Sequence, residues 1–210
     1  MDGERLLAWR GPEPRRVDVA AVRLGPDHLT AHGTSTTRDH TTEYRLHTDT
    51  GWVTRRLEVR TRGDGWARTL LLERSAEGSW SADRGLEGTA RTDADHEARL
   101  PDLTGALDCD LGLCPLTNTM PVLRHELVRR AHERVATTVD LTMAWVSVPD
   151  LTVHAAPQTY SALHPVDPGG GAVIGFAGEG FGTAIEVDGD GLVVAYPGIA
   201  LRLVGAVAKG

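Results

Sequence analysis

The stretch VATTVDLTMAW at residues 135–145 decides the fold, because apolar and polar side chains alternate along it. One face carries Val135, Thr137, Val139, Leu141, Met143 and Trp145. An alternation of this kind is typical of a half-buried β-strand, and at about 3.3 Å per residue the strand would be roughly 35 Å long. Strands of that length twist and curl, which favours a barrel or half-barrel.

Shorter alternating runs precede and follow this strand, with turn residues between them. Residues 17–21 alternate before a Gly-Pro-Asp turn, and Asp64-Gly65 is a hairpin signal. Residues 183–187 and 192–196 alternate on either side of Asp-Gly-Asp-Gly. Strand patterns recur at hairpin spacing and do not alternate with helices, which argues against a parallel α/β fold. The sequence therefore predicts an all-β, mainly antiparallel fold, with residues 1–210 forming a single β half-barrel domain around a highly curved, half-open sheet.

Two parts of the chain depart from the strand pattern. Residues 81–115 are rich in Asp, Gly and Thr and predict a long irregular connection with a short strand near residues 85–90. A short helix is expected near residues 118–129, where Pro121 suits a first helical turn. Apolar residues recur there at helical spacing: Met120, Leu123, Leu127 and Ala131. Further on, a short strand is expected at residues 158–163 and a loop at 165–171.

Charge and composition exclude several classes of protein. A formal net charge of −7 without a basic face argues against nucleic-acid binding. The N-terminus is charged, and no apolar run approaches the length of a membrane span, so the expected location is cytoplasmic. Reduced, buried thiols are expected for Cys109 and Cys114.

No metal or cofactor site is expected. The cysteines stand four residues apart without further Cys or a His pair, which is a poor zinc arrangement. His125-Glu126 resembles half of a zinc-protease helix motif, but Arg129 stands where the second His is required.

The segment at residues 107–124 gathers acidic, amide, hydroxyl and guanidinium groups among apolar residues. Asp108 and Asp110, if buried, require partners such as Arg124 or the backbone donors near Asn118. Three interpretations follow from the residues: a rigid plug closing one end of a barrel, a polar end to an apolar pocket, or a catalytic group.

The same segment resembles the hallmark of a bacterial protein family labelled putative glycolipid-binding. The resemblance rests on Asp-Cys-Asp-Leu-Gly at 108–112 and Pro-Leu-Thr-Asn-Thr-Met-Pro-Val-Leu-Arg at 115–124. Weaker matches lie at 51–55, 148–151, 158–160 and 187–197, and the chain departs from the family at Ile199, where an aromatic residue is usual. The resemblance implies a half-open barrel similar to bacterial lipoprotein and lipid carriers, with a glycolipid or other apolar small molecule as ligand.

Two functional hypotheses follow. In the first, a half-barrel lined by apolar residues holds an apolar ligand whose headgroup meets polar residues of the segment. The residues expected to bind it are Asp110, Asn118, Arg124, Trp145, Tyr160 and Tyr196, with Leu141, Met143 and Ile185 also lining the interior. In the second, an enzyme acts on a small apolar metabolite, with Asp108 or Asp110 as general base and Asn118 and Arg124 as electrostatic stabilisers. The same apolar residues also describe a filled core, and an exposed sheet edge would suit a structural or oligomeric role.

Overall fold

The computed structural model describes residues 3–12, 14–89 and 99–203, and these form one large sheet. The strands are β1 (Arg5–Gly11), β2 (Arg16–Leu24), β3 (Leu29–Thr36), β4 (Thr41–Asp49), β5 (Val53–Gly63), β6 (Trp66–Arg74), β7 (Trp80–Gly88), β8 (Asp108–Leu111), β9 (Thr137–Val146), β10 (Val153–Val166), β11 (Gly171–Gly178), β12 (Phe181–Val187), β13 (Val193–Tyr196) and β14 (Ala200–Arg202). Helical elements are η1 (Thr50–Trp52), η2 (Pro115–Asn118), α2 (Thr119–Arg124) and α3 (Leu127–Glu133). None of these helices is long and apolar enough to span a membrane.

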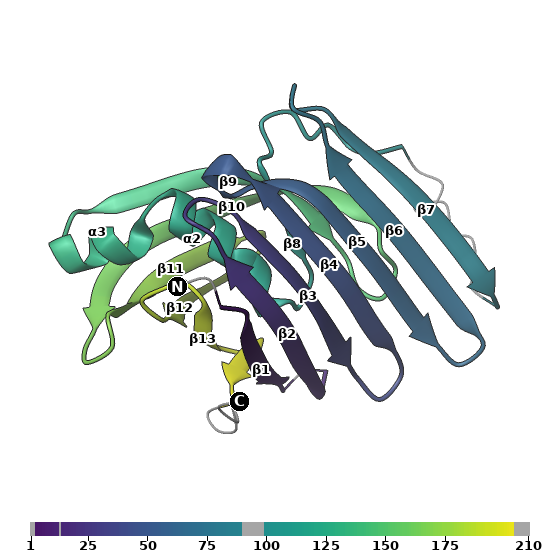
Figure 1. The fold of residues 1–210 in the computed structure, drawn as a ribbon, viewed down its shortest axis with the longest axis horizontal. Coiled ribbons are helices and arrows are strands. Elements are labelled where there is room, and N and C mark those ends of the chain that lie inside the picture. Colours follow the sequence, from purple (N-terminus) through teal and green to yellow (C-terminus); the bar gives the residue numbers. More distant parts are fainter. Residues whose placement is uncertain (1–2, 13, 90–98, 204–210) are drawn as a thin grey trace.

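The sheet runs in the order β7-β6-β5-β4-β3-β2-β1-β14-β13-β12-β11-β10-β9-β8 (Figure 1). All pairings among the described strands are antiparallel except that of β8 with β9, so the mainly antiparallel prediction is confirmed. The sheet curves without closing, and its last strand turns back toward β5. There the backbone N–H of Thr54 donates to the carbonyl of Leu107 at 2.9 Å. The predicted half-barrel is therefore observed.

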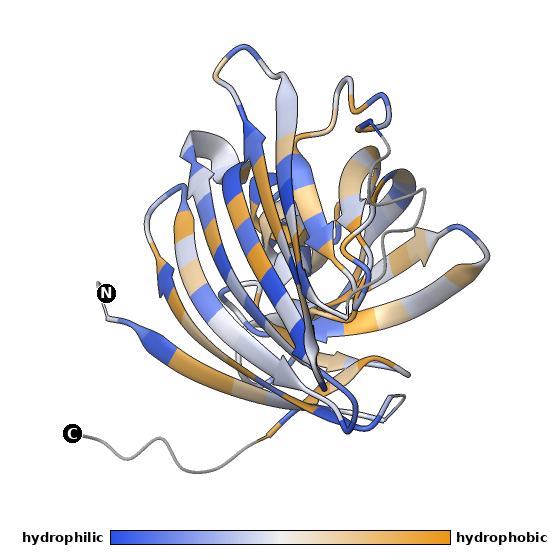
Figure 2. Ribbon diagram, turned by 90° about the vertical axis from the view of Figure 1, so that its right-hand side faces the viewer, coloured by the Kyte–Doolittle hydropathy of each residue, from blue (hydrophilic) through white to orange (hydrophobic). Residues whose placement is uncertain are grey.

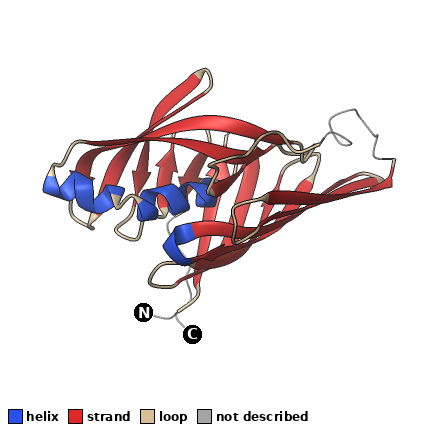
Figure 3. Ribbon diagram, turned by 90° about the horizontal axis from the view of Figure 1, so that it is seen from above, coloured by secondary structure: helices blue, strands red, loops and turns tan. Residues whose placement is uncertain are grey.

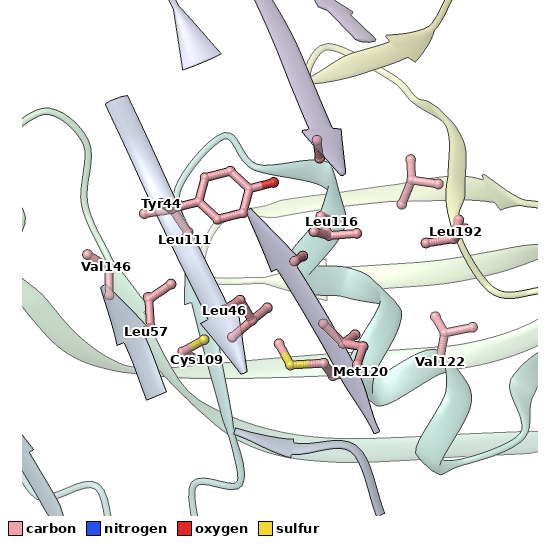
Figure 4. Packing of buried hydrophobic residues seen from close by; sticks show 14 of the residues in the cluster. Tyr44, Leu46, Leu57, Cys109, Leu111, Leu116, Met120, Val122, Val146 and Leu192 are labelled. Carbon is pink, nitrogen blue, oxygen red and sulfur yellow. The ribbon is translucent and has the colours of Figure 1, made fainter. Parts of the chain in front are cut away.

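The helices lie inside the curve of the sheet and fill it (Figure 3). Apolar and polar residues alternate along the strands, so that one face of each strand points to this interior (Figure 2). Close packing joins residues from β4 and β5 with residues from β8, β9, η2 and α2 (Figure 4). The labelled members of this core are Tyr44, Leu46, Leu57, Cys109, Leu111, Leu116, Met120, Val122, Val146 and Leu192. Most of the interior is thus a packed core.

Two strands are longer than the sequence suggested. β7 covers Trp80–Gly88, where an irregular connection with a short strand near residues 85–90 was expected, and β10 covers Val153–Val166 in place of a short strand and loop. β10 pairs with β9 from Val153 to Ala162 and with β11 from Thr159 to Val166, and each of its two prolines lies where only one neighbouring strand is paired: Pro157 with β9 and Pro165 with β11. In β7, Trp80 and Ala82 pack against the core, but Arg84 shares their face of the strand, so the alternation is weak in sequence.

The expected short helix is present but interrupted. α2 ends at Arg124 and α3 begins at Leu127, because Glu126 adopts a left-handed conformation with φ of 53°. The predicted helical spacing still holds, since Met120, Leu127 and Ala131 are all buried.

One buried cation joins three distant segments. The side chain of Arg16 on β2 is fully buried, and its Nε donates to Asp18 at 3.0 Å. Its Nη2 donates to the carbonyls of Leu113 at 2.7 Å and Ile199 at 2.6 Å. Charge-assisted bonds of this kind are stronger than neutral ones, and removing one partner of a buried pair leaves the other uncompensated.

We expect Arg16→Met to lower the free energy of unfolding by about 3–5 kcal/mol, because Asp18 would stay buried without its partner. Urea unfolding followed by circular dichroism measures the change. The exposed neighbour Arg15 serves as control, and Arg15→Met should change the same quantity by less than about 0.5 kcal/mol. Equal losses in the two variants would show that Arg16 has no special role.

Candidate ligand-binding cleft

A cleft of about 730 Å3 opens on one side of the filled interior. It lies where β8, β9 and β10 meet the ends of β11, β12 and β13. Its lining consists of Asp110, Leu111, Gly112, Leu113, Cys114, Asn118, Trp145, Val148, His154, Ala155, Ala156, Pro157, Gln158, Phe176, Gly178, Glu179, Phe181, Tyr196 and Ile199. Its size and mixed lining fall in the range of small-molecule sites.

Aromatic rings form one wall of this cleft. The ring of Phe176 lies 5.6 Å from that of Tyr196 and 6.2 Å from that of Phe181. Across the cleft, Trp145 and His154 are direct partners on neighbouring strands, with ring centroids 5.6 Å apart. Phe181 is 45% exposed, so apolar surface remains available at the mouth. Aromatic groups in these positions offer contact area to an apolar ligand.

The polar end of the cleft is built around Asp110 on β8. One carboxylate oxygen accepts a hydrogen bond from Thr117 Oγ1 and the other from Gln158 Nε2, each at 2.7 Å. Burial raises the pKa of Asp110, while these two hydrogen bonds act in the opposite direction. The parallel pairing of β8 with β9 sets Asp110 beside Trp145, and the turn η2 brings Thr117 over it.

Tyr160 lies behind this polar end and joins two of its amides. Its hydroxyl is 2.9 Å from Asn118 Oδ1 and 3.1 Å from Gln158 Oε1. Asn118 in turn donates to the carbonyl of Pro115 at 3.3 Å. Burial raises the pKa of Tyr160 well above its ordinary value, so the phenol stays protonated. The result is a connected network that holds Asp110, Asn118 and Gln158 in place.

The six residues expected to bind ligand separate into three groups. Asp110, Asn118, Trp145 and Tyr196 line the cleft together. Tyr160 and Ile185 are buried members of the packed core, and Met143 is fully buried as well, so none of these three expected lining residues lines the cleft.

The sixth, Arg124, is not among the lining residues and is engaged elsewhere. It is ion-paired with Asp108, whose side chain is 1% exposed. Burial raises the pKa of Asp108 to about 6, and the neighbouring guanidinium of Arg124 opposes the rise. Asp108 does not line the cleft either, which separates it chemically from Asp110 although only one residue stands between them.

Several cleft residues were not singled out in the sequence. Gln158 shares a strand face with Tyr160, two residues away, which is a signal that period-two reasoning could have used. Phe176 and Phe181 are the two phenylalanines of the chain, and both line the cleft. Their strand alternation did not reveal which face would meet a cleft.

The lining of the cleft is acidic to neutral. It contains the carboxylates of Asp110 and Glu179 and the imidazole of His154. No Lys or Arg is among the described lining residues. No cluster of three or more His, Cys, Asp or Glu suited to a metal ion occurs in the described parts of the chain.

Comparison with known proteins gives one family and one solved structure. A family model described as putative glycolipid-binding matches residues 6–202. The crystal structure of a DUF1089 family protein from Pseudomonas aeruginosa is similar, with a TM-score of 0.63 and 25% sequence identity over 89% of this chain and 92% of that one. No curated protein matches the chain in sequence.

We expect the contribution of Asp108 to stability to fall as the pH rises from about 5 to about 7. Its pKa is raised from 3.8 to about 6 on folding, so the folded protein holds this proton more tightly than the unfolded chain. The favourable contribution is therefore complete below the unfolded pKa and is lost as pH rises through the folded one. The measurement is the difference in free energy of unfolding between the unaltered protein and Asp108→Asn at both pH values.

Asp102 provides the control for this titration. A hydrogen bond from the Thr104 hydroxyl lowers its pKa below 3.8, so Asp102→Asn should show the same difference at both pH values. A difference for Asp108→Asn that is flat, or that grows with pH, would contradict the assignment.

Proposed function

Because this chain belongs to the family described as putative glycolipid-binding, we propose that the cleft binds an amphipathic small molecule such as a glycolipid. The observation that carries the proposal is a cleft of about 730 Å3 whose lining combines aromatic rings with hydrogen-bonding groups. The apolar part of the ligand would lie against Trp145, Phe176, Phe181 and Tyr196. The headgroup would meet Asp110, Asn118 and Gln158.

The polar end supports a headgroup that carries hydroxyl groups. Each oxygen of Asp110 accepts one hydrogen bond from the protein and retains capacity for another. The amides of Asn118 and Gln158 each use one N–H internally, which leaves a second donor on each. A hydroxyl both donates and accepts, so a sugar or other polyol satisfies this mixed set, whereas an anionic headgroup would face the carboxylates of Asp110 and Glu179.

One observation favours an enzyme as the second candidate. Asp110 faces the cleft, and burial raises its pKa, which are the properties of a general base. The stabilising role expected of Arg124 does not fit this site, because Arg124 is paired with Asp108 outside the cleft lining. In this alternative Asp110 would act with Asn118 and Gln158 alone.

We expect the neutral probe N-phenyl-1-naphthylamine to bind with a saturable rise in fluorescence, and octyl glucoside below its micelle concentration to displace it. Phe181→Ser should weaken the affinity by roughly fivefold, since it removes about 1 kcal/mol of apolar contact. Leu163→Ser is the matched control, because Leu163 is 51% exposed but is not among the lining residues. Absence of saturable binding, or an equal loss in both variants, would overturn the proposal.

Asp110→Asn separates the two candidates. A binding protein should keep its affinity for the probe and lose mainly the displacement by octyl glucoside, because the probe needs no headgroup contact. For an enzyme, hydrolysis or another conversion of octyl glucoside by the unaltered protein would be detected by mass spectrometry and would disappear in Asp110→Asn. Unchanged octyl glucoside in the presence of the unaltered protein would count against the enzyme.

A further inference from the structure

A patch of apolar side chains lies on the outer face of the sheet, turned away from the core. Five of the eight large exposed apolar residues gather there, on β1 and β2 and on or next to β14: Leu6, Val17, Val19, Leu201 and Leu203. We call these five the outer patch. Isolated exposed apolar residues are ordinary, but a contiguous group is typical of an interaction surface.

Strand register shows that the outer patch is continuous. Arg10 is the direct partner of Leu201 on one side and of Val17 on the other, so these three side chains form one row across the sheet. The next row holds Ala8 opposite Val19. Leu203 lies beside it, since its backbone N–H donates to the carbonyl of Ala8 at 2.8 Å. Directly opposed residues in antiparallel strands share a face.

Three exposed arginines lie in and beside the outer patch, and the carboxylates of Glu4 and Glu186 lie at its margins. Arg10, Arg15 and Arg23 are exposed, and none of them makes an ion pair with a described residue. The outward-facing positions of β1, β2 and β14 include no carboxylate. In contrast, the arginines on the outer face of β5 are paired, as in Arg56 with Glu73 and Arg60 with Glu87.

The exposed apolar residues and the unpaired arginines together indicate which kind of partner the outer patch binds. A second copy packed face to face would bring arginines toward arginines, and like charges in apposition are unfavourable. A surface that offers both acyl chains and negative charge matches both features at once. We propose that the outer patch, with Arg10, Arg15 and Arg23, docks on the surface of an anionic lipid bilayer.

The outer patch also leads to the candidate cleft. A groove of about 950 Å3 is lined by Arg10, Arg15, Val17 and Leu201, and also by Tyr196. Tyr196 lines the ligand cleft as well. A docked protein would therefore hold one end of the cleft near the lipid surface. This last step, a route for an amphipathic ligand between bilayer and cleft, rests on the proposed function, whereas the docking does not.

The test is co-sedimentation of the full chain with vesicles of phosphatidylcholine, alone or mixed with phosphatidylglycerol. Binding is expected with the mixed vesicles and should weaken as salt rises, because exposed charges are screened. Arg10→Glu should lower the partition coefficient by roughly fivefold or more, since each basic residue near an anionic surface contributes about that factor. Val17→Thr with Leu201→Thr should lower it independently.

Matched controls keep the result specific. Arg134→Glu and Leu163→Thr alter an exposed arginine at the end of α3 and an exposed leucine on β10, both away from the outer patch, and both variants should bind vesicles as the unaltered protein does. Circular dichroism confirms folding of each variant. Absence of binding to the mixed vesicles, or equal loss in the controls, overturns the proposal. A dimer in light scattering that Val17→Thr with Leu201→Thr dissociates also overturns it, in favour of a second copy.

The two proposals fail separately. Binding of N-phenyl-1-naphthylamine is measured without vesicles, and vesicle binding is measured without probe. Probe binding that persists in a protein that does not sediment removes only the docking surface. Sedimentation without probe binding removes only the ligand cleft and leaves the docking surface standing.

Discussion

The buried guanidinium of Arg16 is the interaction on which the arrangement of the cleft depends. It extends from β2 and reaches the carbonyls of Leu113 and Ile199, which belong to segments far away in sequence. Both of these residues line the cleft, although Arg16 does not. Arg16 thus holds Leu113 and Ile199 in place from outside the cleft. A charge at this depth is tolerated because Asp18 and two carbonyl oxygens replace its lost hydration.

Asp108 and Asp110 show how neighbouring positions in one strand take different roles. Asp108 is paired with Arg124, while Asp110 is held by a hydroxyl and an amide and faces the cleft. An ion pair commits a carboxylate to structure, since it faces the guanidinium and not a ligand. Neutral donors leave the carboxylate with hydrogen-bonding capacity that a ligand can use. The difference comes from the tertiary contacts of the strand, because the two side chains are chemically identical.

Much of the fold was predictable, because period-two alternation survives in the strands that have one buried face. The strand at residues 135–145 was expected and β9 covers most of it. β10 was underestimated because a loop was expected from Pro165 on, whereas pairing with β11 carries the strand to Val166. The polar segment was expected to be important, and Asp110 and Asn118 do face a cleft. Arg124 was expected there too, but of its two roles expected from the sequence, ligand contact and partner of a buried aspartate, the fold shows the pairing with Asp108.

The roles of Arg16, Phe176 and Phe181 were not predicted, because they depend on contacts that form only in the folded chain. An arginine beside another arginine looks like part of a solvated surface, and only the folded chain shows that one of the pair points inward. Phe176 and Phe181 belong to ordinary strand patterns, and their meeting with Tyr196 follows from pairing and curvature that arise over the whole sheet. Composition and alternation determine which residues are inside, but the position of a cleft depends on where packing stops.

The hydroxyl of Tyr160 has a single proton and faces two amide oxygens, those of Asn118 and Gln158. With Asp110 ionised, one of these oxygens lacks a proton to accept. If Asp110 takes up a proton and the Gln158 amide turns over, Asp110 donates to Gln158, Gln158 donates to Tyr160, and Tyr160 donates to Asn118. Every group then has a partner, and no heavy-atom position changes except by exchange of the amide oxygen and nitrogen. One proton on Asp110, together with turnover of the Gln158 amide, would thus reverse the donor and acceptor roles between Asp110, Gln158 and Tyr160.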